Sequence, residues 1–279
     1  MNTTTSFPPR GLFRDREAAL ANTLVLAWTC AGWLGSIALM GSSTVILNVA
    51  GVLLCAQTMI FAAYLIHEAA HQTLFAAHAA NAFAGEVMSF IAGSSYASFE
   101  RIRHMHIRHH LDRADLTCFD FKGLMRRRPG VRRTLQILEW AYVPATEVLM
   151  HWQVVARPFF VASQRRHLPR AAAMLIVRLV LLGLWSWKAL LLYVVAAALF
   201  LHVLNFFDAF HHTFEQYFVG ADEPVPMAGR DRRYEHANTY SNVISRRHPW
   251  LNLLVLNFGY RLQFPFSNLS SLILFTDCQ

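Results

Sequence analysis

The chain has 279 residues, of which 55% are hydrophobic and 15% are charged, and its formal net charge is +8. A soluble domain usually carries about 25% charged residues, so this composition, with a mean hydropathy of +0.31, argues against a soluble protein and for the lipid bilayer. Nucleic-acid binding is disfavoured, because no nucleic-acid-binding signature accompanies the basic residues. No two cysteines form a CxxC pair, so neither a disulfide framework nor a thiolate metal site is predicted.

The first predicted elements are two apolar runs, 22–40 and 44–66, separated by Gly41-Ser42-Ser43. Each run is long enough to cross the ~30 Å hydrocarbon core as a helix. The short break between them predicts an antiparallel transmembrane hairpin. Arginines near the N-terminus place the start of this hairpin in the cytosol, so the second helix is expected to return to the cytosolic face at His67.

The middle of the chain is less regular. Residues 75–99 are apolar but are interrupted by Gly85-Glu86 and by Gly93-Ser94-Ser95, which predicts a re-entrant or interfacial helix. The basic stretch 100–133 is expected on the cytosolic side, where such residues favour anionic headgroups. Segment 134–170 has apolar and aromatic residues at roughly helical spacing and is expected to lie along the membrane interface.

A second predicted hairpin comprises 171–187 and 189–210, with its turn near Ser186-Trp187-Lys188. Arg178 falls inside the first of these helices and should face the bundle or extend to the membrane surface. The hairpin returns to the cytosol at His211-His212. The sequence therefore predicts an all-α membrane protein with four transmembrane helices in two hairpins, each of which delivers histidines to the cytosolic face.

The fourteen histidines include two clusters with the spacing of metal ligands. His67 and His71 are four residues apart, so a helix presents both on one face. His106, His109 and His110 form a second set at i, i+3 and i+4. Imidazoles this close repel one another when protonated, and a metal ion is the usual reason to keep them together. Isolated histidines are interpreted as ordinary structural residues (His78, His151 and His167).

The first cluster, His67-Glu68-Ala69-Ala70-His71, also fits the HExxH motif of zinc proteases, with Glu68 as general base. An intramembrane metalloprotease is therefore an alternative. Zinc proteases use three protein ligands and one open position, whereas this chain offers at least six histidines at ligand-like spacing, enough for two metals. Replacing Glu68 by Gln would abolish a protease but would leave metal in an iron site.

Five stretches resemble the motifs of membrane fatty acid desaturases: HEAAHQTLF at 67–75, RHMHIRHHLD at 103–112, HHTFE at 211–215, EHANTYSN at 235–242 and LNFGY at 256–260. The resemblance covers about residues 20–260 of one domain that comprises 1–279. It implies four transmembrane helices and a cytosolic helical cap that holds two irons. It also implies an enzyme that introduces a double bond or a hydroxyl into a lipid acyl chain, using O2 and electrons from a separate donor such as ferredoxin.

Residue by residue, the resemblance implies a set of iron ligands (His67, His71, His106, His109, His110 and His212). It implies no catalytic residue beyond these ligands and no organic cofactor. Nearby acids, for which Glu68, Asp112 and Asp208 are candidates, are expected to orient the imidazoles through hydrogen bonds. The expected location is a bacterial inner membrane, with the N-terminus and the histidine clusters in the cytosol.

The sequence departs from the family after Tyr260. Desaturases have a third histidine box there, which would place histidines at positions 261, 264 and 265, but this chain has Arg261, Phe264 and Pro265. Residues 261–279 contain no histidine and resemble an altered or frame-shifted C-terminus. We therefore expect this chain to bind at most one iron tightly and to have weak or no desaturase activity. A catalytically inactive protein with the desaturase fold is the corresponding alternative.

Overall fold

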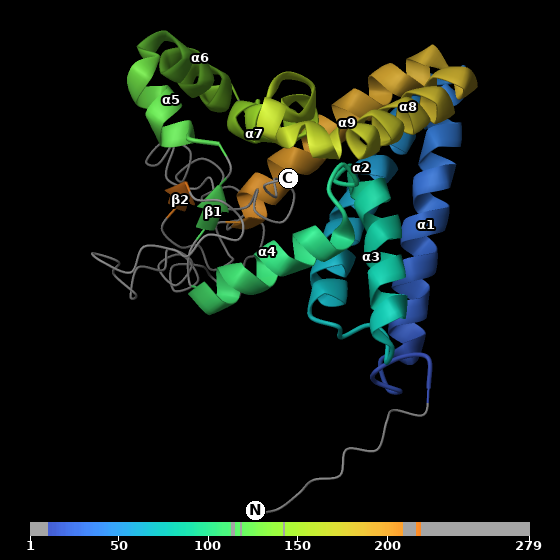
Figure 1. The fold of residues 1–279 in the computed structure, drawn as a ribbon. Helices are drawn as coiled ribbons and strands as arrows, with labels where there is room; N and C mark the ends of the chain where they lie inside the picture. Colours follow the sequence, from blue (N-terminus) through green and yellow to red (C-terminus); the bar gives the residue numbers. More distant parts are fainter. Residues whose placement is uncertain (1–10, 113–114, 118, 142, 209–215, 219–279) are drawn as a thin grey trace, which may run out of the picture.

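The computed structural model describes residues 11–112, 115–117, 119–141, 143–208 and 216–218 (Figure 1). Its helices are α1 (Ala19–Gly41), α2 (Val45–Ala70), α3 (His78–Ala92), α4 (Phe99–Asp112), α5 (Phe121–Arg127), α6 (Pro129–Trp140), α7 (Ala145–Phe160), the 3-10 helix η1 (Ala162–His167), α8 (Leu168–Trp185) and α9 (Trp187–Asp208). Two three-residue strands, β1 (Asp115–Thr117) and β2 (Gln216–Phe218), pair in parallel. Apart from this pair, the described part of the chain is all-α, as predicted.

Four helical segments are long and apolar enough to cross a membrane, namely Ala19–Gly41, Val45–Ala70, Ala162–Trp185 and Trp187–Leu204. They correspond to the four apolar runs of the sequence, so the prediction of two hairpins is confirmed. Both hairpins have tight turns, because α1 is separated from α2 by three residues and α8 is separated from α9 by Ser186 alone.

The two turns contact each other at one end of the molecule. Lys188 Nζ, at the start of α9, donates to the carbonyl of Ser42 and to Asn48 Oδ1 at 3.2 Å. The Asn48 amide in turn donates to the carbonyls of Leu39, Met40 and Ser42 at 3.0, 3.1 and 2.9 Å. From this shared end, α1 and α2 run in one direction and α8 and α9 in another, so the hairpins diverge (Figure 1).

Arg178 faces the helix bundle, as predicted for a charge within a membrane helix. Its guanidinium is buried, donates to the hydroxyl of Tyr193 on α9 and donates to the carbonyl of Phe90 on α3 at 2.6 Å. It also lies 4.9 Å from the centre of the Phe90 ring and 5.6 Å from that of Tyr193, which is the distance of cation–π contacts. Arg178 therefore joins α8 to both α3 and α9.

The apolar segment 75–99 forms a helix that packs along α2 (Figure 1). With 15 residues, α3 is about 22 Å long and too short to cross the bilayer. The predicted interruption at Gly85-Glu86 is wrong, since the helix runs straight through it. The interruption at Gly93 is real: this residue has φ of +88° and ends the helix in the left-handed conformation that favours glycine.

Gly85 and Glu86 form the contact that fixes the start of α4. A Cβ on Gly85 would lie 2.2 Å from the ring of Phe99, the first residue of α4. Glu86 Oε1 accepts from the backbone N–H of Phe99 at 2.9 Å, while its other oxygen accepts from Arg170 of α8 at 2.6 Å. Arg170 also donates to the carbonyl of Ser95 at 2.9 Å. Helix α4 is thus held against α3, and this contact is tied to α8.

Gly85→Ala is expected to destabilise the protein by about 1–3 kcal/mol, because the added methyl group overlaps a buried ring that cannot retreat without moving α4. Thermal unfolding in detergent measures this change. The matched control is Gly35→Ala on α1, where a Cβ meets nothing within 4 Å, and where alanine should stabilise the helix by up to about 1 kcal/mol. Equal stabilities of the two variants would contradict the contact.

Candidate metal centre

The first pair of histidines lies at the end of a membrane helix. His67 is in the last turn of α2 and His71 caps its C-terminus, with the His71 backbone N–H donating to the His67 carbonyl at 3.1 Å. This regular turn places the two rings side by side, with their centroids 4.6 Å apart. The i, i+4 spacing in the sequence therefore produces a shared face.

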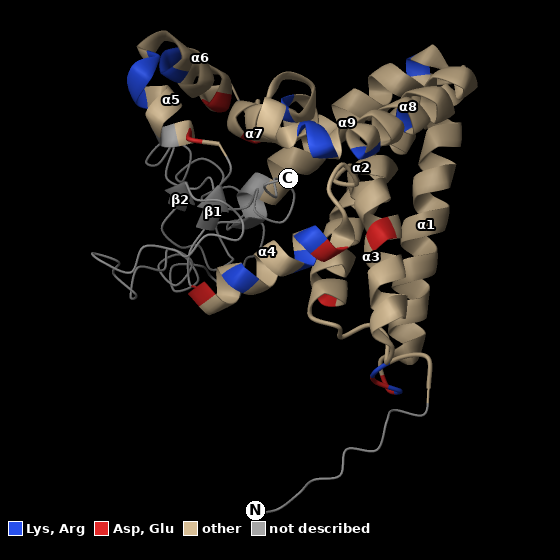
Figure 2. Cartoon of the chain, viewed as in Figure 1, with Lys and Arg blue, Asp and Glu red and all other residues tan. Residues whose placement is uncertain are grey.

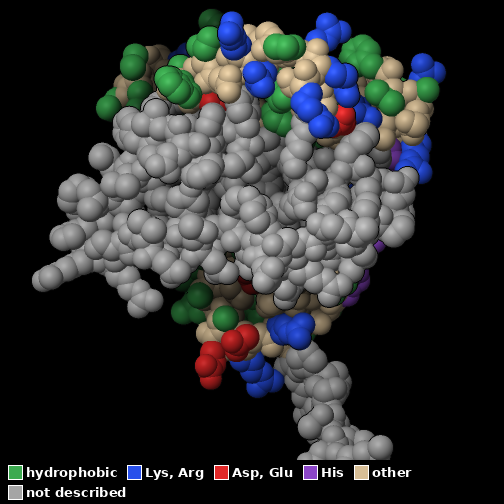
Figure 3. Space-filling model, turned by 90° about the vertical axis from the view of Figure 1, so that its left-hand side faces the viewer, with side chains coloured by type: hydrophobic (Ala, Val, Ile, Leu, Met, Phe, Trp, Pro, Cys, Tyr) green, Lys and Arg blue, Asp and Glu red, His purple; other side chains and the backbone are tan. Residues whose placement is uncertain are grey.

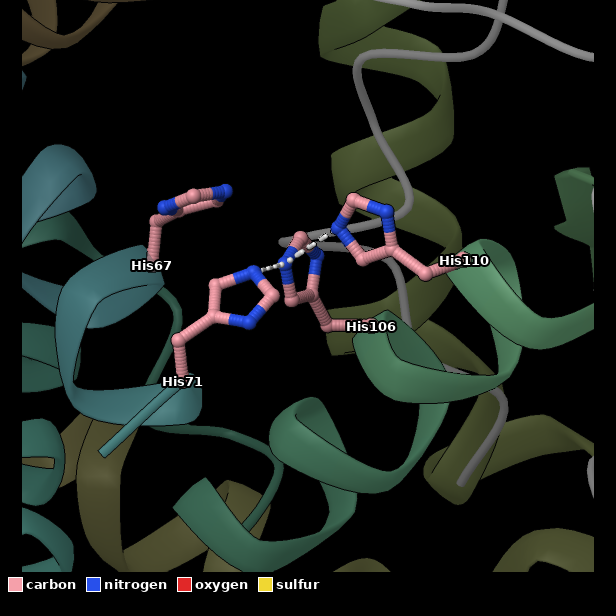
Figure 4. Close-up of side chains that lie close together, drawn as sticks. All are labelled: His67, His71, His106 and His110. Carbon is pink, nitrogen blue, oxygen red and sulfur yellow. Dashed lines mark hydrogen bonds between the residues drawn. The ribbon is translucent and has the colours of Figure 1, made fainter. Parts of the chain in front are cut away.

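The second set lies on α4, which crosses the end of α2. His106 and His110 are one turn apart, with ring centroids separated by 4.6 Å. His106 also lies 4.7 Å from His67 and 4.8 Å from His71 between ring centroids, so these α4 side chains point toward α2. Two histidines from each helix thus face one another, as Figure 4 shows.

The four side chains converge on one small volume. One ring nitrogen from each of His67, His71, His106 and His110 lies within 4.8 Å of all the others. His106 Nε2 is 2.9 Å from His71 Nε2 and 3.1 Å from His110 Nε2 (Figure 4). An imidazole nitrogen carries either one hydrogen or one lone pair, so it makes a single good hydrogen bond and cannot satisfy both neighbours. Metal–nitrogen bonds of about 2.1 Å place neighbouring ligand atoms about 3 Å apart, which fits this spacing.

The electrostatics of the α4 histidines also suit a metal. Burial and, after it, the neighbouring imidazoles together lower the pKa of His106 to about 2. Burial likewise lowers the pKa of His109 to about 4. Both rings are therefore neutral at physiological pH and keep a lone pair for coordination. Neutral imidazole is a ligand for iron, zinc, copper and nickel.

His109 lies beside this group but is not part of it. Its ring is buried and lies 6.1 Å from that of His106 and 5.2 Å from that of His110 between centroids. Among the residues that the structure describes, the mutually close nitrogens come only from the other four histidines. His212, the sixth expected ligand, lies outside the described residues, as do His236, His248 and positions 261, 264 and 265.

The three candidate acids have different surroundings. Glu68 Oε1 lies 3.4 Å from His67 Nδ1, which is the geometry expected of an acid that orients a ligand. Thr73 holds the other carboxylate oxygen at 2.5 Å and also donates to the Glu68 carbonyl, a role that the sequence did not suggest. Asp112 accepts from Arg108, one turn before it on α4, at 2.8 and 2.9 Å. The side chain of Asp208 is not among those described.

The isolated histidines lie outside the cluster. His78, at the start of α3, lies 3.2 Å from Glu100, and His167 accepts from Arg166 at 2.9 Å. His151 is on α7, where its ring packs against Tyr96. None of the three is among the converging nitrogens, and their interpretation as structural residues stays a prediction.

The four apolar helices and the histidine-rich centre at the end of α2 define an integral membrane protein with a metal-type site. The family model for fatty acid desaturases matches residues 43–263, more than half of the chain. The chain therefore belongs to the fatty acid desaturase family. Neither a curated protein nor a solved structure matches it.

His71→Ala and His106→Ala are each expected to reduce metal affinity at least about tenfold, because each removes one of four converging imidazoles. Metal bound per chain, measured by mass spectrometry after titration with Fe2+, tests this. His78→Ala is the matched control, since His78 lies outside the cluster. Retention of metal by both cluster variants would show that these imidazoles do not form the site.

Acid is expected to destabilise the metal-free protein. His109 is neutral in the folded state down to about pH 4, whereas in the unfolded chain it takes up a proton below about pH 6.5. The unfolded state therefore binds more protons in this window, and stability falls by up to about 3 kcal/mol as the pH drops from 6.5 to 4. Unfolding midpoints across this range should fall less steeply for His109→Gln than for the parent, and parallel curves would contradict the assignment.

Proposed function

We propose that this protein is an iron-dependent membrane oxidoreductase that acts on the acyl chain of a lipid. The observation that carries the proposal is the convergence of four imidazoles at the end of a membrane-spanning helix, in a chain of the fatty acid desaturase family. A site at the end of α2 is at a membrane surface. A long acyl chain that lies in the bilayer can reach such a site without leaving an apolar environment.

The proposed ligands are His67, His71, His106 and His110, with His109 and His212 as further ligands. Bound iron would supply the oxidising power, derived from O2, that is needed to remove hydrogen from an unactivated methylene. The chain's own residues hold the metal through neutral nitrogens, which leave it more electrophilic than carboxylates would. Glu68, fixed by Thr73, orients the His67 ring through its second nitrogen.

The inclusion of His212 rests on the family resemblance, since this residue lies outside those that the structure describes.

The reaction also needs electrons and a defined membrane side. We propose that a separate soluble donor such as ferredoxin supplies the electrons. The N-terminus and the histidine cluster then lie in the cytosol, and the membrane is a bacterial inner membrane. The arginines before α1 and along α4–α6 favour the cytosolic side under the positive-inside rule.

A second candidate is a protein with the desaturase fold that does not turn over. It is favoured by the absence of histidine at positions 261, 264 and 265, where the third box of the family would lie. The described residues supply one group of four imidazoles, which suits a single tightly held iron. Under this candidate the chain retains its iron site but lacks the second iron that desaturation requires.

The protease alternative is less well supported. Zinc proteases use three protein ligands and keep a fourth position for water, whereas four imidazoles converge here. Glu68 is engaged by His67 and Thr73 instead of facing an open position. The variant Glu68→Gln is expected to retain iron, whereas the same substitution would abolish the activity of a zinc protease. This variant therefore distinguishes the oxidoreductase from the protease.

The decisive test restores the third box. The parent chain and the triple variant Arg261→His, Phe264→His, Pro265→His are expressed in bacteria with a ferredoxin and its reductase. We expect about one iron per parent chain, more in the variant, and new unsaturated or hydroxylated acyl chains in the variant's lipids by mass spectrometry. Adding His106→Ala to the variant serves as the inactive control. Two irons with full turnover in the parent would exclude the inactive candidate, and no iron in any chain would overturn the proposal.

A further inference from the structure

Helices α5 and α6 carry a basic and apolar surface on the outside of the fold, where Arg127 donates to Asp120 at 3.1 Å. It consists of exposed arginines and two large exposed apolar side chains, which we call the α6 face (Arg126, Arg127, Arg128, Arg132, Arg133, Ile137 and Trp140). Ile137 is 67% exposed and Trp140 is 62% exposed. Figure 2 shows the basic residues on these two helices, and Figure 3 shows basic and apolar side chains interleaved along the upper part of the molecule.

The periodicity of α6 separates Arg133, Ile137 and Trp140 from the side that packs inside the protein. Leu135 and Glu139, four residues apart, are buried toward α5 and α7, where Leu135 joins a small core with Phe121. Arg133, Ile137 and Trp140 follow the i, i+4, i+7 pattern, which places them together on the opposite side of the helix. The exposed apolar residues are therefore not an edge of the core but a second apolar stripe, bordered by arginine.

The chain leads from this face through α7 to a membrane-spanning segment. Helix α7 follows α6 and leads through η1 into the third membrane-spanning segment, which begins at Ala162. Large apolar side chains are exposed along α7 as well: Trp152 at 60%, Phe159 at 41% and Phe160 at 80%. Exposed tryptophan and phenylalanine next to a membrane entry point are typical of segments that lie in the headgroup region.

The charge of residues 121–138 indicates which kind of partner the α6 face binds. Between Asp120 and Glu139 the sequence has no acidic residue and six basic ones. Such a surface would attract either anionic phospholipid or an acidic soluble protein. Only lipid also accounts for Ile137 and Trp140, because these side chains gain about 25 cal/mol per Å2 when they leave water for the acyl region, whereas a docking site for a soluble redox carrier is mainly charged.

We propose that the α6 face lies on the bilayer that the protein spans, with its arginines on anionic phospholipid headgroups and with Ile137 and Trp140 inserted below them. The face is then a lipid-binding site separate from the metal centre. It fixes the position of α5–α7 relative to the membrane plane. This proposal does not depend on the oxidoreductase function, and it holds equally for a chain without turnover.

The test follows an environment-sensitive fluorophore (NBD) attached at Ile137→Cys in a chain whose other cysteines are replaced by Ala. The labelled protein is placed in nanodiscs of phosphatidylcholine alone or with increasing phosphatidylglycerol. We expect a blue-shifted emission that grows with phosphatidylglycerol, that is quenched by lipids spin-labelled near the headgroup, and that is reversed by salt. Arg132→Gln with Arg133→Gln should raise the phosphatidylglycerol fraction needed for half of the shift about threefold.

The matched control is Arg165→Gln with Arg166→Gln, which removes the same charge from η1, where both side chains are exposed. This pair of substitutions should leave the emission shift of the label at position 137 unchanged. An equal effect of the two pairs would show that the shift depends on the net charge of the protein and not on the α6 face. A label that stays in water in every lipid overturns the proposal. The proposal is also overturned if the label is shielded from water only when an acidic ferredoxin is added. It is likewise overturned if the protein itself shields the label from water in nanodiscs without phosphatidylglycerol.

Discussion

The contact between α3 and α4 determines whether the two histidine pairs can meet. One pair is fixed at the end of α2, but the other is on a separate helix whose direction depends on how its first residue is held. Phe99 fits over Gly85 and its backbone N–H is bonded by Glu86, so the start of α4 is fixed in position and in rotation. His106 then reaches His71 with their nitrogens 2.9 Å apart. The metal-type geometry is therefore a consequence of packing two turns of helix away from it.

The sequence predicted those features that depend on local pattern. The length of each apolar run is enough to identify a membrane helix, and a spacing of three or four residues is enough to place histidines on one helical face. The role of Gly85-Glu86 was missed because its partners, Phe99 and Arg170, lie 13 and 84 residues along the chain from Glu86. A small residue and an acid within an apolar run look like an interruption until the helix that packs on them is known. Thr73 was missed for the same reason, since its contact with Glu68 forms only where the chain turns at the end of α2.

The position of His109 differs from that of its neighbours, which shows that the spacing of histidines in the sequence does not alone identify which rings converge. His106 and His110 are one turn apart and face α2, while His109 is rotated by about 100° from His110 and is buried at the side of the cluster. Here the run of three histidines at i, i+3 and i+4 places two rings, not three, in the group of converging nitrogens. The fifth imidazole lies beside the four converging nitrogens and is not among them.

The joining of the two hairpins at their turns has a mechanical consequence for the opposite end. The hydrogen bonds of Lys188 and Asn48 join the two hairpins at one end, and α9 extends about 33 Å from this contact. A tilt of α9 by about 5° about this contact would displace its far end by about 3 Å, comparable to the distance between two ligand atoms. That end leads within four residues to His212. Arg178, by attaching α8 and α9 to α3, restrains this tilt together with Ala196 and Phe200 of α9, which pack into the main core. A cation inside the membrane thus helps to limit an angular error that would otherwise grow with every turn of the helix.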